Sequence, residues 1–128
     1  RLVKRTYDRG MGFLNQRAYD KAARVFKTML KRYSDHDLAD NALYWLGETA
    51  YARGQWLQGL TWFQDLMVRY PQGNKLPDAM LKAAMCYANL GQTSYALQLL
   101  SEVESIFHTT AVADVARKKR MALTGGGH

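Results

Sequence analysis

A repeat with a period of 37 residues constrains the fold of this chain more than any other feature of its sequence. The step of 37 brings similar residues into register over most of the chain, so chance is a poor explanation. Repeats of roughly 20 to 50 residues are typical of proteins in which each unit buries its apolar face on the next unit. The clearest sets in register are Phe26, Phe63 and Leu100; Tyr33, Tyr70 and Phe107; and Ala22, Gly59 and Ala96.

The apolar residues inside each unit follow the helical period. In the stretch AARVFKTMLKRY, apolar side chains recur at steps of three and four and therefore share one face of a helix. Gly54 and Gly91 stand where a helix should end, because glycine adopts the left-handed conformation that closes helices. The sequence predicts an all-α chain with helices near residues 3–15, 18–33, 40–53, 56–70, 77–90, 93–107 and 111–123.

These helices are expected to form three helical hairpins and a single capping helix. The capping helix should cover the last hairpin with Val112, Val115 and Ala116 and turn a polar face outward, as the end units of repeat arrays require. The expected domain comprises repeats at about residues 3–36, 40–73 and 77–110, the capping helix at 111–123 and a flexible tail at 124–128.

The middle unit resembles the tetratricopeptide repeat (TPR), whose pattern runs roughly W-x2-L-G-x2-Y, then A-x3-F, then P. Leu43 replaces the tryptophan, and the period is 37 residues where the TPR has about 34. The resemblance implies a TPR solenoid, in which paired helices stack into a curved array with a concave groove. The matching positions are Leu46-Gly47, Gly54, Trp56, Gly59-x3-Phe63 and Pro71.

A longer stretch resembles one particular TPR family. The segments LADNALYWLGETAY and KLPDA are similar to the C-terminal domain of the Tol-Pal accessory protein of Gram-negative bacteria, the YbgF/CpoB family. The resemblance implies a periplasmic adaptor that engages a protein partner such as TolA and links outer-membrane constriction to envelope synthesis at division. A scaffold related to the outer-membrane assembly lipoprotein BamD, or a cytoplasmic TPR scaffold, is the alternative.

The charge is distributed unevenly along the chain. Its net value is +7, from 18 Lys and Arg against 11 Asp and Glu, and both ends are basic whereas the middle is acidic. Residues 1–32 hold ten basic and two acidic residues, and residues 117–120 read RKKR. Basic patches attract phosphate groups. Aromatic residues are not interleaved with these charges at positions expected to be exposed, so nucleic-acid binding is the least favoured function.

Motifs for catalysis and for metal or cofactor binding are absent from the sequence. It contains no glycine-rich phosphate loop, no nucleophile elbow and no zinc-ligand spacing. Cys86 is the only cysteine and is expected to be a small buried side chain. The apolar stretches are too short to span a membrane. We therefore expect a non-enzyme without cofactor, metal, small-molecule substrate or membrane insertion, and the start at Arg1 indicates a piece of a longer protein.

The repeat register, read with the TPR resemblance, predicts which side chains line the concave groove. Tyr44 and Tyr51 are expected to face outward together, because seven residues make two helical turns. Leu81 and Met85 have an alternative role, which is to pack between neighbouring helices. A mostly apolar lining suits an amphipathic helix or an extended peptide of a partner protein. The predicted lining is Tyr7, Met11, Leu14, Asn15, Tyr44, Glu48, Tyr51, Leu81, Met85, Asn89 and Lys118.

Overall fold

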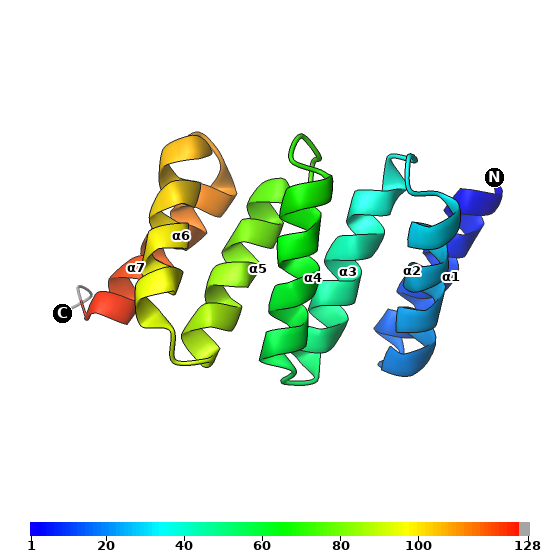
Figure 1. The fold of residues 1–128 in the computed structure, drawn as a ribbon, viewed down its shortest axis with the longest axis horizontal. Helices are drawn as coiled ribbons and strands as arrows, with labels where there is room; N and C mark the ends of the chain where they lie inside the picture. The colour runs from blue at the N-terminus through cyan, green and yellow to red at the C-terminus, as the bar shows by residue number, and fades with distance from the viewer. Residues whose placement is uncertain (126–128) are drawn as a thin grey trace.

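Seven helices stand side by side in a row in the computed structural model, which describes residues 1–125 (Figure 1). The first helix and the last helix lie at opposite ends of the row. Residues 1–125 contain no strand, and none of their helices is long and apolar enough to cross a membrane. The helices are α1 (Leu2–Asn15), α2 (Tyr19–Arg32), α3 (Leu38–Ala52), α4 (Trp56–Arg69), α5 (Leu76–Asn89), α6 (Thr93–Ile106) and α7 (Ala111–Thr124).

The predicted all-α architecture of three hairpins and a final single helix is confirmed, and every helix begins and ends within two residues of its predicted position. The last helix ends one residue later than predicted, at Thr124. Thr124 is still helical, because its hydroxyl donates to the carbonyl of Arg120 and the left-handed Gly125, at φ 72°, ends the helix. The rest of the predicted tail, residues 126–128, lies outside the described residues.

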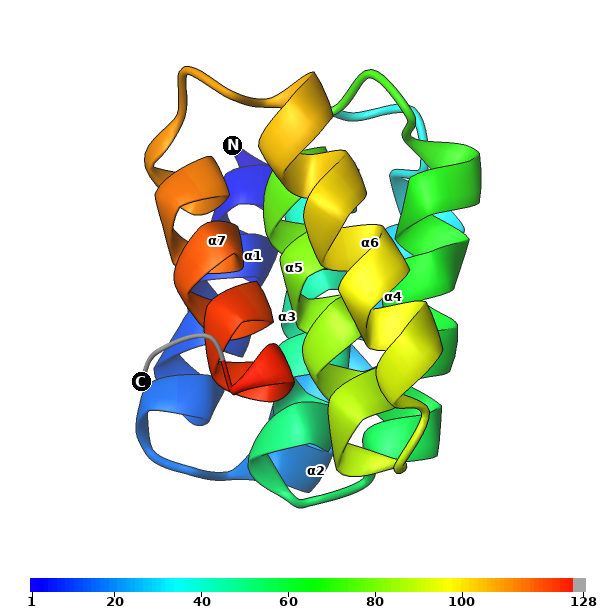
Figure 2. The same ribbon diagram turned by 90° about the vertical axis from the view of Figure 1, so that its left-hand side faces the viewer.

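The odd-numbered helices lie on one side of the row (Figure 2). Consecutive helices pack against each other throughout, and in addition α1 contacts α3 and α5 contacts α7. Seen along the row, α1 and α7 lie on the opposite side from α4 and α6 (Figure 2). We call the solvent-facing side of α1, α3, α5 and α7 the inner face, and that of α2, α4 and α6 the outer face.

The hairpin turns close with one residue in the left-handed conformation. Gly54 has φ 71° and Gly91 has φ 79°, as the sequence predicts, and Arg17 holds the equivalent position in the first hairpin with φ 60°. A side chain in this conformation costs roughly 1–2 kcal/mol. The first hairpin turn is therefore more strained than the other two.

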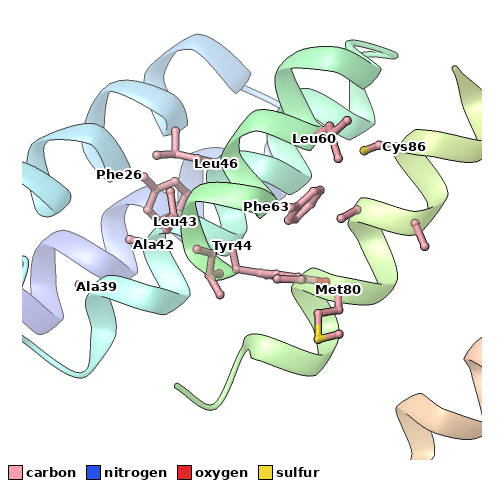
Figure 3. Close-up of a cluster of buried hydrophobic side chains, with 14 of the residues drawn as sticks. Phe26, Ala39, Ala42, Leu43, Tyr44, Leu46, Leu60, Phe63, Met80 and Cys86 are labelled. Carbon is pink, nitrogen blue, oxygen red and sulfur yellow. The ribbon is translucent and has the colours of Figure 1, made fainter. Parts of the chain in front are cut away.

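A matched pair of residues sets the distance between the two helices of each hairpin. A Cβ built at Gly47 would collide with the ring of Phe63, and one built at Gly10 would lie 2.6 Å from the ring of Phe26. Phe26 and Phe63 are fully buried in the core (Figure 3). In the third hairpin both members change together, because the equivalent positions hold Ala84 and the shorter Leu100, and both are fully buried.

Asp40 joins the second hairpin to the third. Its residue surface is 4% exposed, and its carboxylate Oδ2 accepts a hydrogen bond of 3.4 Å from the backbone N–H of Lys75, at the N-terminus of α5. A negative charge is favourable there because helix dipoles point their positive end toward the N-terminus. A Cβ at Gly73 would collide with this carboxylate, so the loop approaches α3 closely only because residue 73 has no side chain.

The final helix caps the array through small buried residues and an ion pair. Ala113 and Ala116 are buried, and the guanidinium of Arg120 donates two hydrogen bonds, of 2.6 and 3.0 Å, to the Glu104 carboxylate of α6. The prediction that Val115 covers the last hairpin is wrong, since this residue is 40% exposed. It lies two residues from Ala113, which in a helix places it on nearly the opposite side.

The ion pair between α6 and α7 predicts a pH-dependent stability. The hydrogen bond from Arg120 lowers the pKa of Glu104. A carboxyl whose pKa falls on folding stabilises the fold above its unfolded pKa of about 4.3 and loses that contribution as the pH falls through the folded value. Glu104→Gln should therefore lower the melting temperature at neutral pH, and the difference should vanish in acid. Thermal melts of both proteins measure it, and an equal difference at both pH values would contradict the assignment.

Candidate functional site

Side chains of α1, α3 and α5 are linked to one another across the inner face. The indole Nε1–H of Trp45 donates a hydrogen bond of 2.8 Å to the hydroxyl of Tyr7, which joins α3 to α1. The amide of Asn89 donates to the hydroxyl of Tyr51 over 3.4 Å, which joins α5 to α3. The links restrain the aromatic side chains, so that a ligand would meet a surface whose shape is already set.

Lys82 places a positive charge in the middle of the inner face. Its Nζ lies 3.2 Å from Glu48 Oε1 and 4.2 Å from the centre of the Tyr51 ring. Cations are attracted to the faces of aromatic rings, so Tyr51 and Glu48 hold the ammonium from two sides. The sequence predicted a mostly uncharged lining, and the structure shows that charged and aromatic groups alternate there.

The prediction that Tyr44 faces outward is wrong. Tyr44 is 7% exposed, and its ring packs on Phe63 and on Trp45, with centroid distances of 5.7 and 5.1 Å. Lys75, at the start of α5, places its Nζ 5.0 Å from the Tyr44 ring centre. Burial, assisted by the Glu48 carboxylate, raises the pKa of Tyr44 above its usual range. Tyr44 therefore supports the inner face from beneath and is not part of its exposed surface.

Three buried side-chain oxygen atoms on α3 have no hydrogen-bond partner among the described residues. They are Asp40 Oδ1, Asn41 Oδ1 and Glu48 Oε1, the last of which forms an ion pair with the Lys82 ammonium at 3.2 Å. Residues 41 and 48 are two helical turns apart and so lie on one side of α3. Buried polar groups in folded proteins normally have a partner, but these atoms lie beneath the surface, so a ligand on the inner face would meet the side chains above them.

The predicted groove residues lie at different depths and do not form one exposed strip. Tyr51 and Asn89 meet, and Glu48 pairs with Lys82. Within residues 1–125, neither Asn15 nor Lys118 makes a side-chain hydrogen bond or ion pair to another predicted groove residue. Leu81 packs against the core. Of the predicted residues other than Tyr44, the half-buried ones are Tyr7, Met11, Leu14, Glu48, Tyr51, Leu81 and Met85, and the exposed ones are Asn15, Asn89 and Lys118.

Four residues of the inner face were missed by the sequence-based prediction. Asn41, Lys75 and Lys82 were not included, and Trp45 was not assigned to either side of its helix. One signal could have found two of them, since Trp45 and Lys82 are 37 residues apart. In the structure both reach back to the preceding odd-numbered helix, Trp45 to Tyr7 and Lys82 to Glu48.

The described residues offer no evident metal site. Within residues 1–125, no group of three or more His, Cys, Asp or Glu side chains could hold a metal ion. Cys86 is fully buried, and burial raises the pKa of its thiol to about 11. The thiol is therefore protonated near neutral pH and is a poor nucleophile.

The fold and the repeat pattern define the class of this protein. Residues 41–73 and 78–107 match the family model described as tetratricopeptide repeat, and the chain is a TPR domain. Within that class it is similar to the cell division coordinator CpoB of Pseudomonas putida, with 40% identity over 48 residues. The match covers 38% of this chain and 18% of the length of that relative.

Solved structures with the same fold come from several bacteria. PcrH from Pseudomonas aeruginosa superposes with a TM-score of 0.82 at 17% identity, over 96% of this chain and 92% of that one. The Yersinia enterocolitica type III secretion chaperone SycD, in complex with a peptide of the translocator YopD, superposes with a TM-score of 0.84 at 14% identity. That match covers 99% of this chain and 95% of SycD. At such low identity these matches establish the fold.

Proposed function

We propose that this TPR domain is a non-catalytic module that binds a segment of a partner protein on its inner face. The observation that carries the proposal is the set of linked side chains across α1, α3 and α5, in which Tyr51 accepts from Asn89 and holds Lys82 over its ring. A bound peptide offers backbone N–H and C=O groups and side chains along its length. The neighbouring Tyr51, Lys82 and Asn89 would contact the apolar and charged side chains of that peptide.

Two further findings support a peptide ligand. TPR proteins of similar shape have been crystallised with peptide segments, namely SycD with a peptide of YopD and PcrH with the chaperone binding region of PopD. The inner face also carries Tyr51 and Trp45, and aromatic residues are enriched at the energetic centres of protein interfaces.

The similarity to CpoB supports a place in the bacterial cell envelope. On that basis the domain belongs to a periplasmic adaptor of the Tol-Pal type, its partner is a TolA-like protein, and it links outer-membrane constriction to envelope synthesis at division. The support comes from 48 aligned residues at 40% identity. These residues cover 18% of the relative, so the partner and the cellular role are part of the proposal.

Site-specific photo-crosslinking tests where the partner binds. A benzophenone amino acid at Asn89, which is exposed beside Tyr51 on the inner face, should crosslink one discrete protein in cell-envelope extract. The same probe at Val68, 79% exposed on α4 of the outer face, is the control and should not. Mass spectrometry would identify the product. Crosslinking from Val68 with none from Asn89 would reject the inner face as the binding site.

A further inference from the structure

A basic hollow of about 430 Å³ opens between α1 and α2 at the N-terminal edge of the array. Its apolar floor includes the ring of Phe13, and two cations lie over that ring: the Arg9 guanidinium carbon at 5.4 Å from its centre and Lys21 Nζ at 5.8 Å. No carboxylate lines this hollow. Its lining residues are Thr6, Arg9 and Phe13 from α1 and Lys21, Arg24, Val25 and Thr28 from α2.

The same positions are covered by a helix in the third repeat. Tyr87 and Leu99 occupy the positions equivalent to Phe13 and Val25, two repeat periods of 37 residues further along the chain. These two residues line a hollow that α4 partly fills with Gln64 and Met67. The Gln64 amide donates a hydrogen bond of 2.8 Å to the hydroxyl of Tyr87.

The second repeat shows the same arrangement. Ala50 and Trp62 occupy the positions equivalent to Phe13 and Val25, one repeat period of 37 residues further along the chain. The preceding α2 covers them with Ala23 and Lys27, and Lys27 Nζ lies 5.9 Å from the Trp62 ring centre. In both later repeats, therefore, the crevice between the two helices of a hairpin receives the second helix of the hairpin before it.

In the first repeat, the described residues place no helix over this crevice. Its chemistry also differs, because Arg9, Lys21 and Arg24 stand where the third repeat has alanine, tyrosine and glutamine. None of these three cations has an ion-pair partner among residues 1–125, since the two acids of the first hairpin pair with Lys4 and Arg53. Three unpaired cations around an apolar floor match a helix with acidic residues beside an apolar stripe.

We propose that the N-terminal edge of the array is a second docking surface, which takes an acidic amphipathic helix of a partner protein. The helix would lie in the crevice between α1 and α2, as α4 lies against the third hairpin. Its apolar stripe would cover Phe13 and Val25, and its carboxylates would pair with the three cations. This site is separate from the inner face and does not depend on the peptide-binding role proposed there.

Charge argues against a second copy of this chain as the occupant. End-to-end stacking would bring the C-terminal edge of one copy, where Lys118 and Lys119 of α7 have no ion-pair partner among residues 1–125, against this basic edge of another. Like charges repel at such a contact. An acidic partner has the complementary charge.

A peptide probe tests the proposal. A fluorescein-labelled synthetic helix of leucine and glutamate, with leucine along one face, should bind the domain at low salt, and fluorescence anisotropy would follow it. The triple variant R9Q/K21Q/R24Q should weaken binding about tenfold, the combined effect of three exposed ion pairs. A matched triple variant R69Q/R117Q/K119Q removes the same charge from α4 and α7 and should bind normally. Thermal melts of both variants would confirm that they fold.

The proposal of an acidic-helix site would be overturned by any of the following results. Absence of binding, equal weakening in the two triple variants, or equal affinity for a matched peptide with glutamine in place of glutamate would each contradict it. Poly(U) RNA or phosphatidylglycerol vesicles that displace the peptide with higher affinity would assign the hollow to phosphate groups instead. Tyr51→Ala should leave this binding unchanged, so failure here and failure of the inner-face proposal can be told apart.

Discussion

Gly47→Ala is expected to lower the free energy of unfolding by roughly 1–3 kcal/mol, the usual effect of overfilling a packed core. The added methyl group would occupy the space of the fully buried Phe63 ring. A surface helix position would give the opposite result, since alanine is favoured over glycine in helices by about 1 kcal/mol. Chemical denaturation of both proteins measures the difference.

Two further variants make this test specific. Gly12 is also within a helix, but a Cβ there has no neighbour within 4 Å, so Gly12→Ala should stabilise the domain. Phe63→Leu combined with Gly47→Ala would reproduce the pair that the third hairpin uses, Ala84 with Leu100. The free energy of unfolding of the double variant should therefore exceed the value expected from adding the two single effects by about 1 kcal/mol. A Gly47→Ala variant as stable as Gly12→Ala would refute the close approach of α3 and α4.

Tyr51→Ala is expected to weaken partner binding by roughly 1–3 kcal/mol, which is about tenfold or more. Tyr51 is half-buried, it holds Lys82 over its ring, and its hydroxyl accepts from Asn89. Its removal deletes an aromatic contact and frees both neighbours. The helix itself should remain intact, because alanine is a good helix former.

Tyr44 is the wrong residue for this experiment, although its position in the repeat suggests it. The ring is buried on Phe63 and Trp45, so truncation would leave a cavity in the core. Lost binding in a Tyr44 variant would then report unfolding as readily as a lost contact. Tyr51 separates the two effects because it lies at the surface of the inner face.

The fold was predictable because two independent signals in the sequence agree. The helical period gives the helices, and the 37-residue register gives their stacking. The close pair of Gly47 and Phe63 appears twice in that register, with Gly10 and Phe26 as the other instance. Only helix ends and single side-chain orientations, such as that of Val115, escaped prediction, since they depend on how neighbouring helices pack.

The candidate site was only partly predictable, for a physical reason. The repeat register predicts which side of its helix a residue occupies. It does not predict which side chains of the next repeat cover that residue. Tyr44 is buried because its ring packs on Phe63 and Trp45, and Lys75 from the start of α5 lies over it. Lys82 belongs to the site because it reaches back to Glu48. Such contacts between units depend on the three-dimensional path of the chain.

The most direct test of the inner-face proposal is calorimetry. The partner protein identified by photo-crosslinking would be purified and titrated into the parent domain and into Tyr51→Ala. Circular dichroism of the variant would establish that it is folded, and Leu57→Ala, which truncates an exposed side chain of α4, serves as the control. We predict that Tyr51→Ala binds at least about tenfold more weakly and that Leu57→Ala binds like the parent. Full affinity in folded Tyr51→Ala, or an equal loss in Leu57→Ala, would show that the partner does not bind on the inner face.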